Sequence, residues 1–164
     1  MTFDFIIIGS GLAGLTSSLV LSEYGSVLLV NKGELTNGAS SLAQGGVAAA
    51  VDDNDSSEEH IRDTLEAGAG HNDGLAVRFL AEHGPEAIVW LEEQGVVFDR
   101  IDNHFMLGKE GAHSHRRILR VTDFTGRNLV NVLAEKVKNN RNITIWEGGF
   151  LLDLLVHEMT APLK

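Results

Sequence analysis

The chain has 164 residues, with 13 Lys and Arg against 23 Asp and Glu, a formal net charge of −10 and no Cys. The acidic balance argues against a basic face for nucleic acid, and the missing Cys excludes disulfides, thiolate zinc sites and cysteine nucleophiles. The length is typical of one domain, and the 18 Gly residues indicate unusual backbone angles or close backbone approach.

The sequence also predicts where the protein is found. No apolar run approaches the ~18 residues of a membrane span. No Lys or Arg precedes Lys32, so the basic start of a signal peptide is missing. We therefore expect a cytoplasmic protein that binds neither nucleic acid nor a membrane.

The amino-terminal part predicts a β-α-β unit. Residues 3–8 are a run of strand formers, as expected of a strand buried on both faces of a parallel sheet. Apolar residues then recur at helical spacing over residues 12–20, and residues 27–30 form a second buried strand. The expected fold class is therefore α/β, Rossmann-like, with a parallel sheet.

The middle of the chain predicts three helices. Ser56 and Glu59 fit a capping box that opens the first, which runs to about residue 67. Asp73 is the expected cap of the second helix, and Gly84-Pro85 should end it and start the third. The expected core face of the second helix is formed by Val77, Phe79 and Leu80.

The last third predicts one helix and several strands. The helix is expected over residues 127–137, with Asp123 and Thr125 as candidates for its amino-terminal cap. Short apolar runs predict strands at residues 96–98, 143–146 and 150–156.

Residues 9–14 read Gly-Ser-Gly-Leu-Ala-Gly, a G-x-G-x-x-G pattern between a strand and a helix. Gly9 permits the tight turn, Gly11 lets the backbone approach a pyrophosphate, and Gly14 lets helix and strand pack closely. Free N–H groups at the start of the helix would bind the anion. We predict dinucleotide binding here. The alternative is a glycine turn that serves packing alone.

The end of the second strand departs from the usual pattern, in which an acidic residue binds the ribose. This chain has Asn31, which can hydrogen-bond a hydroxyl, followed by Lys32, which can meet ribose or phosphate. A basic residue here keeps NADP open as a ligand. The alternative for Lys32 is a solvated side chain at a strand end.

Two further segments carry candidate chemistry. Residues 39–46 combine small side chains with paired Gly, so this loop can lie flat against a planar group. Residues 110–119 could bind an anionic substrate through His113, His115, Arg116 and Arg117, beside Glu110. Without Cys or a second acidic cluster we expect no metal site. The alternatives are a flexible surface loop for the first segment and a structural polar loop for the second.

Taken in order, these segments resemble the fumarate reductase/succinate dehydrogenase flavoprotein family. The resemblance rests on residues 9–14, on Ala-Gln-Gly-Gly-Val-Ala-Ala at 43–49, and on Glu-Gly-Ala-His-Ser-His-Arg-Arg-Ile-Leu at 110–119, followed by Asp-x-Thr-Gly at 123–126. Within the family the chain is most similar to members that oxidise L-aspartate to iminoaspartate, with oxygen or fumarate as acceptor, as the first step of NAD biosynthesis. Ala112 stands where the family has Gly, and Arg120 where His is common.

The resemblance implies noncovalently bound FAD, L-aspartate as substrate, and an association with quinolinate synthase. Because family members also carry a capping and a helical domain, we expect residues 1–164 to be the amino-terminal part of the FAD-binding domain, incomplete at the C-terminus and inactive by itself. Glu110 would orient the substrate amino group. The residues implied in FAD binding are Gly9, Ser10, Gly11, Leu12, Ala13, Gly14, Asn31, Lys32, Ala39, Ser40, Ser41, Leu42, Ala43, Gln44, Gly45, Gly46, Phe150 and Leu151.

Two other functions stay open. One is the membrane-associated flavoprotein subunit of succinate dehydrogenase or fumarate reductase, whose flavin-bearing histidine would fall at the position of Ala39. The other is a module without catalysis that binds FAD or NADP. In a visible absorbance spectrum, flavin bands support the two flavoenzyme functions, and their absence opens the module without catalysis.

Overall fold

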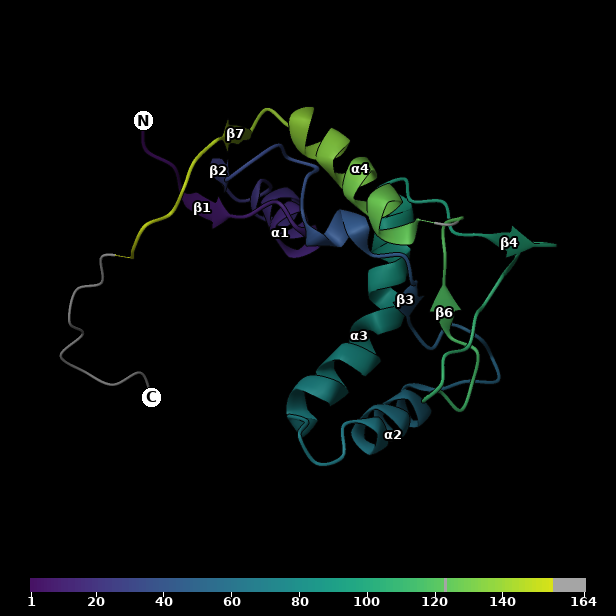
Figure 1. Cartoon of the computed structure of the whole chain (residues 1–164). Helices are drawn as coiled ribbons and strands as arrows, with labels where there is room; N and C mark the ends of the chain where they lie inside the picture. Colours follow the sequence, from purple (N-terminus) through teal and green to yellow (C-terminus); the bar gives the residue numbers. More distant parts are fainter. Residues whose placement is uncertain (123, 155–164) are drawn as a thin grey trace.

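The computed structural model, which describes residues 1–122 and 124–154, contains a sheet of three parallel strands towards one end of the molecule (Figure 1). The strands β1 (Phe5–Ile8), β2 (Val27–Asn31) and β7 (Ile143–Glu147) lie in the order β1-β2-β7. This arrangement confirms the expected α/β class and three of the predicted strands.

Two helices, α1 (Leu12–Leu21) and α4 (Thr125–Lys138), pack against each other and against the sheet (Figure 1). Alternate strand residues meet them, because successive side chains of a strand point to opposite faces. The core between sheet and helices includes Val27, Leu29 and Leu133, all fully buried. Since α1 begins just after β1, the glycine turn lies at the carboxyl end of the sheet.

A pair of helices extends away from the sheet (Figure 1): α2 (Ser57–Ala67) and α3 (Gly74–Glu93). Ser56 Oγ accepts a hydrogen bond from the N–H of Glu59 at 3.2 Å, and the Asp73 carboxylate accepts from two N–H groups of α3, which confirms both predicted caps. Among the described residues, every helix is too short or too polar to span a lipid bilayer.

α3 continues unbroken through Pro85, so the prediction of two helices here is wrong. A proline inside a helix lacks the N–H that would bond the carbonyl four residues earlier. That carbonyl belongs to Ala81, and it accepts a hydrogen bond from Ser57 Oγ of α2 at 3.1 Å. The partner helix therefore satisfies the group that Pro85 leaves free.

The core face of α3 also differs from the prediction. Val77 is buried, but Phe79 and Leu80 are 62% and 70% exposed. The buried positions are Val77, Ala81 and Ile88, which follow the helical spacing that places side chains four and seven residues apart on one face.

Three other predicted features are corrected. Residues 96–98 form no strand, although Val96 and Phe98 are buried in the core. Residues 150–154 are likewise irregular, and the rest of that predicted strand lies outside the described residues. Thr125 is the first residue of α4 rather than its cap, and its Oγ1 accepts from the N–H of Val121; Asp123 also lies outside the described residues.

The remaining elements join the two segments singled out above. The 3₁₀ helix η1 (Ala39–Leu42) leads to β3 (Val47–Ala48), which pairs antiparallel with β6 (Ile118–Leu119). A separate two-stranded hairpin is formed by β4 (Arg100–Ile101) and β5 (His104–Phe105). The β3–β6 pair brings residues 39–46 next to residues 110–119, which are about 70 positions apart in the chain.

Candidate functional site

The glycine turn needs the three glycines of its motif at these places. Gly9 adopts φ +97°, in the left-handed region that side chains disfavour. A Cβ added to Gly14 would lie 1.9 Å from the carbonyl oxygen of Gly9, and one added to Gly11 would lie 3.2 Å from Ser40 Oγ. The turn therefore brings α1 closer to the end of β1 than any other residue at Gly14 allows, and it leaves little room between Gly11 and η1.

The amino end of α1 presents free N–H groups. The helix has no side-chain cap, the N–H of Leu12 donates to Ser40 Oγ at 3.2 Å, and that of Gly9 donates to the Val30 carbonyl. Within the described residues, the N–H groups of Gly11, Ala13 and Gly14 have no hydrogen-bond partner. Unpaired N–H groups at a helix start are suited to bind phosphate, so this end of α1 fits a pyrophosphate.

Asn31, at the end of β2, uses its side-chain amide within the protein. Its Oδ1 accepts from the N–H of Ser10 at 3.3 Å, and its Nδ2 donates to the carbonyls of Gly33 and Glu34 at 3.0 and 2.9 Å. Asn31 thus ties the glycine turn to the loop after β2. A direct bond from Asn31 to a ribose stays a prediction.

The neighbouring Lys32 contacts another predicted cofactor residue. Its Nζ lies 5.0 Å from the ring centroid of Phe150, within the range of a cation–π interaction. Both residues are exposed, as is Leu151. The structure therefore gathers Asn31, Lys32 and Phe150 at the ends of β2 and β7, where the Gly149 N–H donates to the Asn31 carbonyl at 3.0 Å.

Residues 39–46 lie against the start of α4. A Cβ on Gly46 would lie 2.2 Å from the Leu119 carbonyl oxygen, so this glycine permits the close β3–β6 approach. Residues 42–46 are exposed, so their surface is open to a ligand. The segment therefore packs against the protein on one side and is open to solvent on the other, as a segment that lies flat against a planar ring must be.

Glu110 belongs to a closed loop, residues 108–118. Gly108 and Ile118 exchange backbone hydrogen bonds at its base, at 2.8 and 3.1 Å. A Cβ on Gly45 would lie 3.8 Å from Glu110 Oε1. The Glu110 carboxylate therefore lies beside the 39–46 segment, as the predicted role beside a flavin requires.

Arg117 does not face this site. Its guanidinium is fully buried and makes two hydrogen bonds to the Asp55 carboxylate and one to Asp63 Oδ2, all at 2.8 Å. The expectation that Arg117 binds an anionic substrate is therefore wrong, because two carboxylates of the protein already neutralise it. His115 also turns to this side, with Nδ1 3.6 Å from Asp55 Oδ1.

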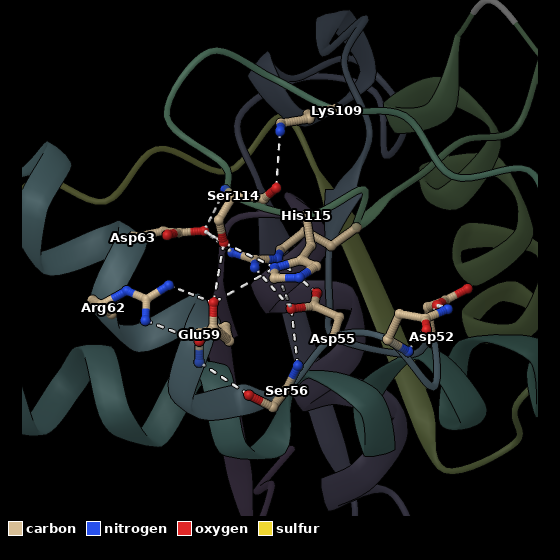
Figure 2. A network of polar contacts seen from close by, with 11 residues as sticks. Asp52, Asp55, Ser56, Glu59, Arg62, Asp63, Lys109, Ser114 and His115 are labelled. Carbon is tan, nitrogen blue, oxygen red and sulfur yellow. Dashed lines mark hydrogen bonds and ion pairs between the residues drawn. The ribbon is translucent and has the colours of Figure 1, made fainter.

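Ser114 completes this network (Figure 2). Its N–H and its Oγ both donate to Asp63 Oδ2, at 2.6 and 2.7 Å. Burial by itself would raise the pKa of the Asp63 carboxyl, but the hydrogen bonds from Ser114 and Arg117 lower that pKa to about 2. Burial by itself would lower the pKa of Arg117, but its hydrogen bonds to Asp55 and Asp63 and the charges of these two carboxylates raise that pKa.

Sequence reasoning missed Asp55 and Asp63. Residues 52–55 look like a solvated acidic turn, and Asp63 lies on a predicted helix with no other signal. Their partner Arg117 is 62 positions from Asp55 and 54 from Asp63, and no local pattern predicts a pairing over that distance. Among residues 113–117 Arg117 alone is buried, and no feature of the sequence separates it from its exposed neighbour Arg116.

Comparison with known proteins identifies the family of the chain. Residues 4–161 match the family model described as FAD binding domain. The L-aspartate oxidase 1 of Ralstonia nicotianae is 47% identical over 158 residues, covering 94% of this chain and 30% of that protein. The L-aspartate oxidase of Vibrio cholerae is 44% identical over 161 residues, with the same two coverages. The chain thus spans about 30% of the length of these relatives.

Solved structures of fumarate reductase and succinate dehydrogenase share the fold of this chain. The E. coli quinol fumarate reductase FrdA matches with a TM-score of 0.92 at 26% identity, over 96% of this chain and 28% of that one. The apo Mycobacterium smegmatis Sdh1 complex matches with a TM-score of 0.81 at 26% identity, over 89% and 27%. These matches confirm the resemblance read from the motifs, and the family model confirms FAD as the cofactor.

Proposed function

We propose that this chain, which belongs to the FAD binding domain family, is the amino-terminal FAD-binding part of an enzyme that oxidises L-aspartate to iminoaspartate. The observation that carries the proposal is the position of Glu110, whose Oε1 would lie 3.8 Å from a Cβ on Gly45. A carboxylate beside residues 39–46, the flavin segment that we propose to line the flavin ring, suits a substrate with an ammonium group. The identity of 44–47% to L-aspartate oxidases supports the same substrate.

Residues of this chain would hold FAD without a covalent bond. The free N–H groups of Gly11, Ala13 and Gly14 suit the pyrophosphate, and Lys32 with Phe150 suits the adenosine end. Residues 39–46 would line the flavin ring. Bound FAD supplies a two-electron acceptor for the hydride at the substrate Cα.

Glu110 would orient the substrate rather than take its proton. An ionised carboxylate accepts hydrogen bonds from an ammonium group, and such charge-assisted bonds are stronger than neutral ones. Holding the ammonium group fixes the Cα–H relative to the flavin segment. Glu110 would thus contribute to the rate by orienting the substrate. The proposal gives Glu110 no role in the proton transfer.

The wider setting is also part of the proposal. The electron acceptor is oxygen or fumarate, and the product iminoaspartate would pass to quinolinate synthase in NAD biosynthesis. The proposed compartment is the cytoplasm, which cell fractionation tests.

The test joins this chain to the remaining part of the Vibrio cholerae enzyme, in place of the 161 matching residues. We expect a yellow protein that forms peroxide and iminoaspartate from L-aspartate when supplied with oxygen. A protein that carries FAD and leaves L-aspartate unchanged would contradict the proposed substrate.

A second candidate is a fumarate reductase or succinate dehydrogenase flavoprotein. It is favoured by the TM-score of 0.92 to FrdA. Ala39 speaks against a covalently bound flavin of that kind, because an alanine offers no imidazole. Succinate oxidation by the same joined protein, in the absence of L-aspartate oxidation, would favour this candidate.

A further inference from the structure

The buried ion network behind the 108–118 loop joins three separate parts of the chain. Arg117 lies just before β6, Asp55 in the turn before α2, and Asp63 on α2 itself. All three side chains are at most 6% exposed. The network therefore fixes α2 and its preceding turn to the loop that carries Glu110.

Stability alone explains such a network poorly. Removing charges from water is costly, and buried ion pairs replaced by well-packed apolar groups are often neutral or stabilising. The planar guanidinium of Arg117 fixes the relative orientation of the groups it joins. Its two nitrogen donors bind the Asp55 carboxylate through two hydrogen bonds of 2.8 Å. The arrangement thus fixes geometry better than it adds stability.

The fixed geometry extends to Glu110 through a short chain of contacts. Asp63 Oδ2 accepts from both donors of Ser114, and the Ser114 carbonyl accepts from Lys109 Nζ at 2.8 Å. The N–H of His113 donates to the Glu110 carbonyl at 3.0 Å. Glu110 therefore lies in a tight turn whose two sides are held by Lys109 and Ser114.

We propose that Asp63 and Arg117 are positioning residues, which act through Ser114 to hold the Glu110 carboxylate beside Gly45 and so set the preference for an amino-bearing substrate. This inference rests on the proposed function. Both side chains are buried, at 0% and 6% exposed, so we assign neither of them a direct contact with substrate or FAD.

We call the contacts of Asp63 with Arg117 and Ser114 the clamp. The first experiment tests this clamp by hydrogen exchange of the backbone N–H groups of residues 110–115. It uses Asp63→Asn, which keeps the volume and removes the charge, and Arg117→Lys, which keeps the charge and removes the fork. We expect exchange in the loop about tenfold faster or more, with α4 unchanged. The control is Arg78→Gln, which removes an exposed pair with Glu82 on α3. Loop exchange at the wild-type rate in both clamp variants would overturn the proposal.

The second experiment uses the joined protein and measures FAD content, KM and kcat for L-aspartate, and inhibition by succinate, which lacks the amino group. We expect Asp63→Asn and Arg117→Lys to raise the KM for L-aspartate about tenfold at unchanged FAD content, with a smaller effect on succinate. Adding either change to Glu110→Gln should raise the KM no further, because all act through one carboxylate.

Other outcomes separate the two proposals. A fall in melting temperature or FAD content with an unchanged KM would mark a purely structural network and overturn the positioning role. An equal weakening of L-aspartate and succinate would overturn it as well. A wild-type joined protein that does not oxidise L-aspartate would defeat the proposed function, while the exchange experiment still decides whether the clamp exists.

Discussion

A Cβ on Gly126 would lie 2.2 Å from the backbone oxygen of Ser40, so the second residue of α4 touches the backbone of η1. The Gly126 N–H also donates to the Ala43 carbonyl at 3.1 Å. The position of η1 and of residues 39–46 therefore depends on a helix that begins more than 80 residues later in the chain.

Gly126→Ala should displace η1 and weaken FAD binding. Overpacking of this kind typically costs about 1–3 kcal/mol. Since about 1.4 kcal/mol is tenfold in affinity, we expect the Kd for FAD to rise by about 5- to 150-fold. Titration of the variant with FAD, followed by absorbance, measures the effect. Gly74→Ala is the matched control, because it adds a methyl group at a helix start with nothing within 4 Å.

FAD should be released by acid. Ala39 offers no imidazole for a bond to the flavin, and the chain has no Cys. After precipitation with acid, we expect the yellow colour in the supernatant. Colour retained in the washed pellet would indicate a covalent bond elsewhere and contradict this prediction.

Acid unfolding should report on Asp63. Its folded pKa of about 2 lies below the ordinary value of 3.8, so the unfolded chain takes up this proton first as the pH falls. The stabilisation from Asp63 is thus fully present above about pH 4 and is lost as the pH falls through about 2. The shift corresponds to about 2 kcal/mol.

The measurement compares wild type and Asp63→Asn by urea unfolding at several pH values. The variant should be less stable at neutral pH, and the difference in free energy of unfolding should shrink towards about pH 2. Parallel pH dependences of the two proteins would contradict the assigned role of this carboxylate.

Local patterns predicted the features of this fold that depend on neighbouring residues. The β-α-β unit, the caps Ser56 and Asp73, and α4 follow from periodicity and capping chemistry, which act within a few residues. The prediction of a helix break at Pro85 was wrong because Ser57, on another helix, donates a hydrogen bond to the Ala81 carbonyl. A proline rule that considers one helix alone cannot include that partner.

The candidate site shows the same division. The glycine turn could be predicted from its sequence motif and Glu110 from the family resemblance. The structure brings Glu110 beside Gly45. The direction of Arg117 could not be predicted, since it depends on two carboxylates that come from α2 and the turn before it. Whether an arginine binds a ligand or is buried in the protein depends on which carboxylates from distant parts of the chain lie beside it in the fold.

Glu110→Gln in the joined protein should weaken turnover of L-aspartate while leaving FAD content unchanged. The amide keeps the size of the side chain and loses the charge that, in the proposed function, meets the ammonium group, and a hydrogen bond to a charged group contributes about 1.5–3 kcal/mol. We therefore expect kcat/KM to fall by about 10- to 150-fold. The Glu110 carboxylate makes no side-chain hydrogen bond to any described residue, so the melting temperature should change little. Glu66→Gln, on the exposed side of α2, is the matched control and should keep wild-type kcat/KM. If Glu110→Gln instead loses FAD in proportion to its activity, Glu110 supports the flavin segment and does not select the substrate.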